Sequence, residues 1–252
     1  MQAEAFERWQ HLTAQAVTRW RRKQAGPLLE LVQQLAEEEE PFLHKQSEHY
    51  GQYLVWYSRL LEQEARWDEA RIVLQEATRV FEQRANHADQ ATCLNNIGTI
   101  YNSQGQLDVA LDYFQRALAL FEQVGNPADI ARSLNNIGMI YKSQGQLDVA
   151  LDYYQRALTL REQVGNPADI ARSCHNIASL RLQQEQWQDA TRLFLRALSL
   201  YERMGSGFES DVADELEWLA VCYVQLGEIE KAVQYYVGAK QIREQLQKSE
   251  TA

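Results

Sequence analysis

The 252-residue sequence contains few cysteines, no long apolar run and more acidic than basic side chains. Its three cysteines are an odd number without the spacing of a metal site, so we expect reduced structural thiols and a cytoplasmic protein. No stretch of eighteen apolar residues occurs, and the first residues form no apolar signal core, so we expect no membrane span and no signal peptide. The net charge of −10 argues against nucleic acid as the main ligand.

Catalytic motifs are also missing from the sequence. No P-loop glycine pattern, nucleophile elbow or pair of catalytic carboxylates is present. His44, Glu48 and His49 resemble a metal-binding pattern, but the zinc-protease motif needs two histidines four residues apart and these are five apart. We therefore predict no enzymatic activity, no cofactor and no metal site.

An internal repeat dominates the chain. Residues 131–170 copy residues 91–130 at thirty-three of forty positions, without an insertion between the copies. A fixed period of this length predicts stacked units, each of which buries its apolar face against the next. The period extends in both directions, with the last copy offset by two residues, and region 41–250 therefore contains five repeats, at about 51–90, 91–130, 131–170, 171–210 and 211–250. Residues 1–40 are predicted to form a degenerate helical pair that caps the stack.

Each repeat predicts two helices, because apolar residues recur at three- and four-residue steps on both sides of a glycine. Gly105 ends the first helix where a left-handed backbone is needed, and Gly125 ends the second. Asn126 is the expected N-cap of the next helix, and Pro127 suits its first turn. Alanines seven residues apart on the second helices let neighbouring helices approach closely; they are Ala110, Ala117, Ala150, Ala157, Ala190, Ala197, Ala232 and Ala239.

These repeats resemble the tetratricopeptide repeat family. The residues that reproduce its signature spacing are Leu94, Ile97, Gly98, Tyr101, Ala110, Phe114 and Ala117. The forty-residue unit is similar to that of spindle-orientation adaptors and kinesin light chains. The resemblance implies an all-α, right-handed α-solenoid of antiparallel helix pairs, in which the first helices line a concave groove. Arg181 and Glu185 depart from the pattern, at the places of a tyrosine and a glycine, as do Ser58 and Leu61 in the first repeat.

The predicted groove carries amides at a forty-residue spacing. Asn96, Asn136 and Asn176 form this asparagine ladder, and each amide offers the donor and acceptor that an extended peptide backbone needs. The resemblance implies that such amides grip a peptide. The alternative is that the amides bond to the adjacent helix inside the stack.

Basic residues in the same groove predict a ligand with carboxylates. Arg132 and Arg172 stand one repeat apart, with Lys142 further along. The remaining candidate binding residues are Asn95, Thr99, Asn135, Met139 and His175, together with Trp56 and Trp218 at the two ends of the groove. The tryptophans are predicted either to anchor a ligand or to pack against flanking helices.

The last helix is apolar over much of its circumference. Tyr235, Tyr236 and Val237 belong to this surface, which predicts an interface. Homodimerisation there and truncation from a longer chain both stay open. The leading functional hypothesis is a non-catalytic scaffold for a peptide partner in the groove. Its alternatives are a regulatory sensor of a small peptide or metabolite that controls an effector, and an architectural oligomer. An RNA-binding repeat is disfavoured by the charge.

Overall fold

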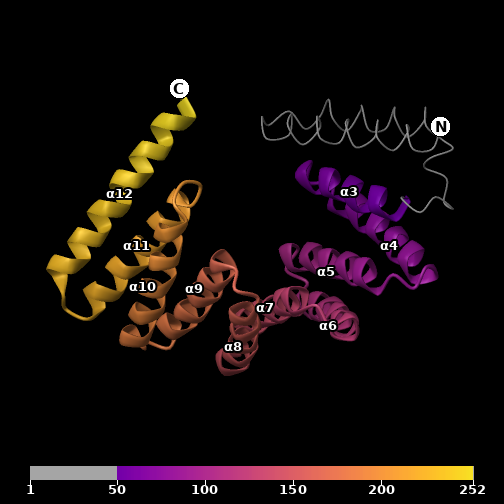
Figure 1. Cartoon of the computed structure of the whole chain (residues 1–252), viewed down its shortest axis with the longest axis horizontal. Helices are drawn as coiled ribbons and strands as arrows, with labels where there is room; N and C mark the ends of the chain where they lie inside the picture. Colours follow the sequence, from indigo (N-terminus) through magenta and orange to yellow (C-terminus); the bar gives the residue numbers. More distant parts are fainter. Residues whose placement is uncertain (1–49, 252) are drawn as a thin grey trace. The chain divides into compact units, whose positions relative to one another are not determined.

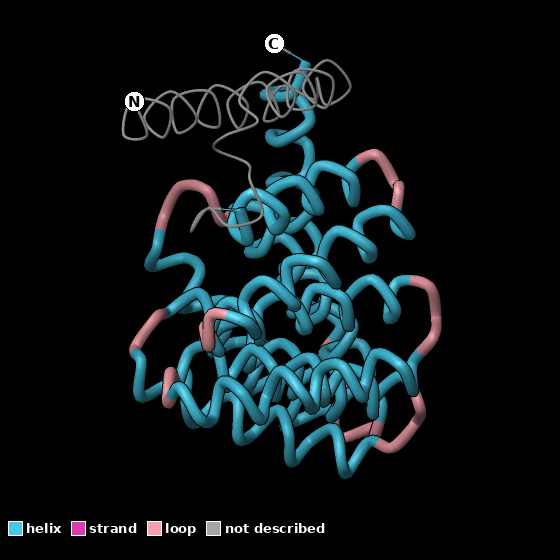
Figure 2. Tube along the Cα trace, turned by 90° about the vertical axis from the view of Figure 1, so that its right-hand side faces the viewer, coloured by secondary structure: helices cyan, strands magenta, loops and turns pink. Residues whose placement is uncertain are grey.

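The computed structural model describes residues 50–251, which form helices joined by short turns, with no strand in this range (Figures 1 and 2). The helices are α3 (Tyr50–Gln63), α4 (Trp67–Gln83), α5 (His87–Ser103), α6 (Leu107–Val124), α7 (Pro127–Ser143), α8 (Leu147–Val164), α9 (Pro167–Gln183), α10 (Trp187–Met204), α11 (Glu209–Gln225) and α12 (Ile229–Thr251). The predicted N-terminal pair over 1–40, and His44, Glu48 and His49, lie outside the described residues.

The chain divides into two compact units, Met1–Val124 and Gly125–Ala252. We refer to residues 50–124 as the first unit and to residues 125–251 as the second unit. In the first unit each of the helices α3 to α6 packs against the next along the chain, and in the second unit α7 to α12 do the same. The predicted all-α solenoid architecture of antiparallel helix pairs is therefore confirmed.

The turns inside the helix pairs share one backbone conformation. Gly105, Gly145 and Gly227 adopt positive φ values of 73°, 75° and 78°, as predicted for a helix that ends in a left-handed residue. Ala65 and Glu185, at the corresponding positions of the other two pairs, also have positive φ, 56° and 59°. The packing of each pair therefore imposes this turn even where no glycine relieves the strain.

The predicted helix starts are also confirmed. The side chain of Asn126 accepts a hydrogen bond from the backbone N–H of Ala128 at 3.1 Å, and Pro127 occupies the first turn of α7. Asn166 caps α9 in the same way, with the Ala168 N–H at 3.0 Å. These caps fix where α7 and α9 begin, and hence which residues each helix presents at its N-terminal end.

Small residues bring the helices of a pair close together. The predicted alanines of the second helices are all buried. In the first unit a Cβ on Gly98 would lie 2.8 Å from the ring of Phe114, and in the second unit a Cβ on Gly138 would lie 2.8 Å from the ring of Tyr154. The glycines thus make room for aromatic rings that fill the interior.

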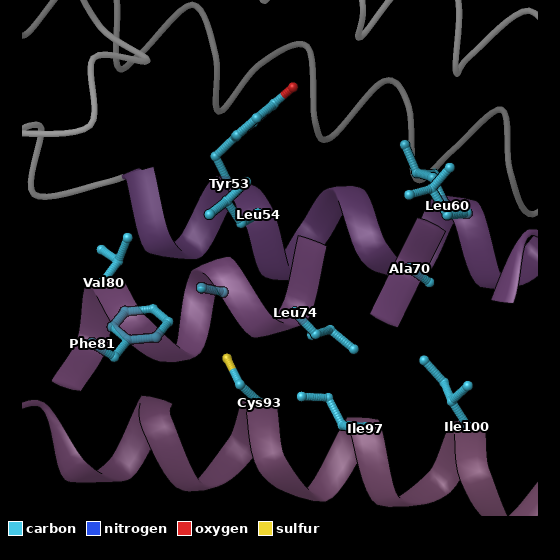
Figure 3. Close-up of a cluster of buried hydrophobic side chains, with 12 residues drawn as sticks. Tyr53, Leu54, Leu60, Ala70, Leu74, Val80, Phe81, Cys93, Ile97 and Ile100 are labelled. Carbon is cyan, nitrogen blue, oxygen red and sulfur yellow. The ribbon is translucent and has the colours of Figure 1, made fainter. Parts of the chain in front are cut away.

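The core of the first unit shows how three successive helices share one apolar layer (Figure 3). Leu74 and Phe81 of α4 point toward Cys93 and Ile97 of α5, and Leu54 belongs to α3. Burial raises the pKa of the Cys93 thiol to about 12, so this cysteine stays protonated and acts as a small apolar residue.

Candidate functional site

The asparagines of α7 and α9 lie at a contact between these two first helices. The side-chain amide of Asn176 donates from Nδ2 to Oδ1 of Asn135 at 2.7 Å. Asn135, Asn136 and Asn176 are all half-buried. One hydrogen bond of Asn176 is therefore made inside the stack, as the alternative interpretation of the ladder expected. That bond uses one of the two N–H donors of the amide.

In the first unit the corresponding residues differ in exposure. Asn95 is buried, with 5% of its surface exposed, and offers little surface to a ligand. Asn96 is half-buried, and Thr99 is exposed, with its hydroxyl donating to the backbone oxygen of Asn95 at 3.1 Å. Trp56 is partly buried against the apolar cluster of α3 to α5.

Lys142 also reaches from α7 to α9. Its Nζ donates to Oγ of Ser179 at 2.6 Å. Desolvation lowers the pKa of Lys142, because the ammonium group loses water while its bonded partner is an uncharged hydroxyl. Met139, one turn earlier on α7, is half-buried. The face shared by α7 and α9 therefore carries a partly desolvated cation beside amides and a thioether.

A buried acid that the sequence analysis missed lies beneath the predicted residues of α9 and α11. Glu215 has 2% of its surface exposed, and its Oε1 lies 2.7 Å from Nδ1 of His175. Burial raises the pKa of Glu215, and the hydrogen bond from His175 opposes this shift. His175 meets the ring of Phe194 edge-on, and Phe194 stacks on Trp218, with ring centroids 6.2 Å apart. Trp218 thus packs on a buried ring and keeps part of its surface exposed.

Signals for Glu215 existed in the sequence. With the two-residue offset of the last repeat, Glu215 takes the place of Ser133 and Ser173, which are buried and uncharged. An acid at a position that is small and buried in the other repeats indicates a special partner, which the structure shows to be His175.

The structure groups Arg132 and Arg172 with a third arginine that sequence reasoning overlooked. Arg132 and Arg172 are exposed and form ion pairs with Asp129 at 2.8 Å and Asp169 at 3.1 Å, each three residues earlier on the same helix. Both arginines and Arg161 line a pocket of about 240 Å³ where α7 and α9 begin and α8 ends. Exposed ion pairs of this kind contribute about 0.2–1 kcal/mol each.

The predicted interface residues of α12 divide into two kinds. Tyr236 and Val237 are exposed, at 59% and 44% of their surface. Tyr235 is half-buried and stacks on Tyr223 of α11, with ring centroids 5.3 Å apart. Tyr235 therefore belongs to the packing of the α11–α12 pair, and the exposed apolar surface consists of its neighbours.

Within residues 50–251, no group of three or more metal-ligating side chains lies close enough to hold a metal ion. In the same range, no helix combines the length and apolar character needed to cross a bilayer.

Comparisons with known proteins identify the repeat. A family model described as tetratricopeptide repeat matches residues 49–123 and 129–203, and a second model of that description matches residues 175–245. No curated protein sequence matches the chain.

Solved structures share the fold at low sequence identity. BtubC (BKLC) from P. vanneervenii has a TM-score of 0.73 and 19% identity, covering 94% of this chain and 92% of that one. The apo form of RapI has a TM-score of 0.68 and 13% identity, covering 96% and 99%. The apo form of the quorum sensor NprR from B. thuringiensis has a TM-score of 0.72 and 18% identity, covering 93% and 64%. Since the family model covers more than half of its residues, the chain belongs to the tetratricopeptide repeat family.

Proposed function

We propose that this protein is a non-catalytic interaction scaffold that binds a peptide segment on the face formed by α7 and α9. The observation that carries the proposal is a continuous set of half-buried polar side chains on two adjacent first helices. They are Asn135, Asn136, Lys142, His175, Asn176 and Ser179. The apolar neighbours Ile137, Ile140 and Ile177 are buried, so the polar residues form the accessible side of the same helices.

Hydrogen bonds between the two helices hold this face in place before a ligand arrives. Asn176 is fixed by Asn135, and Lys142 is fixed by Ser179. Side chains that are already ordered lose less conformational entropy on binding, which favours affinity. The amide oxygen and second N–H of Asn176 match the donor and acceptor of an extended peptide backbone.

The charge on this face favours an acidic ligand. Lys142 is partly desolvated and is bonded to a hydroxyl. A carboxylate from a bound peptide would replace the lost hydration of the ammonium group with an opposite charge. We therefore propose that the peptide places an Asp or Glu side chain near Lys142.

The test is binding of fluorescein-labelled acidic peptides, with neutral peptides of the same length for comparison, measured by fluorescence anisotropy. The double variant Asn136→Ala/Asn176→Ala, which removes the two ladder asparagines of this face, is expected to weaken binding, with each lost hydrogen bond contributing about 0.5–1.5 kcal/mol. Gln115→Ala and Gln155→Ala remove exposed amides from the second helices and serve as the matched control. Unchanged affinity in the double variant would reject these asparagines as the binding element.

A second candidate function is self-association through α12. The exposed apolar residues Ile229, Val233, Tyr236 and Val237 favour it, because exposed apolar side chains on one helix tend to mark an interface. Sedimentation of the wild type and of Tyr236→Lys/Val237→Lys tests self-association separately from peptide binding. A wild-type chain that remains monomeric at high concentration excludes self-association, and the peptide-binding proposal still stands.

A further inference from the structure

Arg161 occupies a buried position that is aromatic in the neighbouring repeats. The residues at this place in α4, α6 and α10 are Phe81, Phe121 and Tyr201. All are buried, and Arg161 itself has only 6% of its surface exposed. A buried guanidinium in place of a ring costs desolvation free energy unless a partner compensates for it.

The bonded partners of Arg161 inside the protein are uncharged. Its Nη1 donates to Oγ of Ser173 at 2.7 Å and to the backbone oxygen of Asp169 at 3.2 Å. Within the described residues, no carboxylate forms an ion pair with it. Burial lowers the pKa of Arg161, and although the charge of Asp169 opposes this shift, the nearby Arg172 adds to it. The positive charge of Arg161 is thus left without a bonded anion.

Two more arginines face the same pocket. Arg132 from α7 and Arg172 from α9 line it together with Arg161, and Asp129 and Asp169 are the carboxylates present. Each carboxylate is bonded to one of the two exposed arginines. Three guanidinium groups against two carboxylates leave one excess positive charge, and the positive helix dipole at the start of α9 adds to it.

The pocket has room for a small anion. Its volume is about 240 Å³, and a water molecule takes about 30 Å³ in the liquid. Guanidinium groups bind oxyanions through paired N–H donors. Three of them, on three helices, suit the several oxygens of a tetrahedral anion better than the two oxygens of a carboxylate.

We propose that the pocket lined by Arg132, Arg161 and Arg172 binds a phosphate group, either free or as a phosphate monoester. Arg161 supplies the buried charge, and Arg132 and Arg172 close around the anion from the two helix starts. This site lies at the ends of the helices and does not depend on the proposed peptide-binding face.

The nearly identical preceding repeat supports this assignment. Residues 91–130 carry Thr92 and Phe121 where residues 131–170 carry Arg132 and Arg161. Two of the seven differences between the copies therefore introduce arginines into one pocket.

The test is isothermal titration of the full chain in a buffer free of phosphate and sulfate, with chloride keeping the ionic strength constant. Inorganic phosphate and O-phospho-L-serine are the two probes, and acetate is the carboxylate comparison. We expect saturable binding of at least one phosphate probe. Tighter binding of inorganic phosphate would indicate a free ion as the ligand, and tighter binding of O-phospho-L-serine would indicate a phosphorylated side chain. Absence of saturable binding, or acetate binding as tightly as phosphate, overturns the proposal.

Arg161→Phe restores the aromatic residue and should weaken phosphate binding by about tenfold or more. The matched control is Arg156→Gln, an arginine of the same helix that is exposed and lies over the ring of Tyr153. Its phosphate affinity should be unchanged, as should that of Asn136→Ala.

An Arg161→Phe variant that binds phosphate like the wild type overturns the proposal. Circular dichroism checks that this variant folds. If it does not, Arg132→Gln/Arg172→Gln changes only exposed side chains and decides the question. Loss of phosphate binding in this double variant supports the site, and unchanged binding rejects it.

Discussion

The two units are built from the same repeat but differ in what they bury. Within residues 50–124 the buried polar side chains are uncharged, namely Ser58 and Asn95. The second unit buries two charged residues, Arg161 and Glu215. The α5–α6 pair and the α7–α8 pair keep the same contact between a glycine and an aromatic ring, and their tyrosine stacks Tyr101–Tyr113 and Tyr141–Tyr153 have the same 5.4 Å separation. The shared residues therefore maintain the fold, and the differing residues change the polar chemistry.

The largest expected effect comes from moving a buried charge into the first unit. Phe121→Arg places a guanidinium at a fully buried position and should lower the free energy of unfolding by about 3–5 kcal/mol. The reciprocal Arg161→Phe should be neutral or stabilising, because an apolar residue replaces a buried ion. Urea unfolding of both variants measures the difference. Equal losses of stability in the two variants would contradict the comparison.

Removing His175, the partner of the buried Glu215, should reduce the stability of the fold nearly as much. His175→Ala leaves the Glu215 carboxyl group buried without its hydrogen bond and should lower the free energy of unfolding by about 3 kcal/mol at pH 7. His87→Ala removes an exposed histidine of the first unit and is the control. Adding Glu215→Leu to His175→Ala should recover much of the stability. Failure to recover would show that packing, and not the buried charge, causes the loss.

The raised pKa of Glu215 predicts the sign of a pH effect. An acid with a higher pKa in the folded state than in the unfolded state stabilises the fold when protonated. This contribution is complete below the unfolded value of about 4.5 and is lost as the pH rises through the higher folded value. The wild type should therefore lose stability relative to Glu215→Gln as the pH is raised from about 4.5 toward neutrality.

Thermal unfolding across this pH range measures the stability difference between wild type and Glu215→Gln. Glu62 of the first unit is less buried, and its pKa is also raised by burial. Glu62→Gln should therefore show the same sign with a smaller amplitude. If the stability difference between the wild type and Glu215→Gln did not vary with pH, the raised pKa of Glu215 in the folded state would be contradicted.

The asparagine caps occur in both units, and removing a cap should cost the same stability in each. Asn86 caps α5 by accepting from the N–H of Asp89, and Asn166 caps α9 by accepting from that of Ala168. Asn86→Ala and Asn166→Ala should each cost about 1 kcal/mol of unfolding free energy. Circular dichroism during urea unfolding checks both values. A loss confined to one of the two variants would show that the caps are not equivalent.

The smallest expected effects lie in the turns. Ala65→Gly and Glu185→Gly remove a side chain from a left-handed backbone and should stabilise the fold by at most about 1 kcal/mol. The flexibility of glycine in the unfolded chain reduces this gain. Differential scanning calorimetry resolves a shift of this size. Destabilisation in both variants would contradict the strain at these turns.

Local features of the fold were predictable from the sequence because neighbouring residues determine them. Gly105, Asn126 and Pro127 act within a few residues of their own positions, and the repeat revealed the helix pairs. The division of the chain after Val124 was not predictable in this way. The string Gly-Asn-Pro-Ala-Asp follows α6 and returns after α8, yet the boundary falls only at the first.

The candidate site was predictable only in part, since burial depends on contacts between helices. The sequence placed Arg132 and Arg172 in a peptide groove, and the structure shows them beside Arg161 at the helix ends. In the sequence, Arg161 stands at a place that is aromatic in α4, α6 and α10. Its hydrogen-bond partner Ser173 lies on the next helix, and no local sequence pattern predicts that bond.

Adjacent residues of α9 reach toward opposite neighbours. Asn176 extends back to Asn135 on α7, and His175 extends forward to Glu215 on α11. Repeat arrays bend by small rotations that accumulate from one repeat to the next. At α9, such a rotation would have to lengthen either the hydrogen bond between Asn176 and Asn135 or the contact between His175 and Glu215. The middle of the second unit should therefore resist twisting more than its ends do.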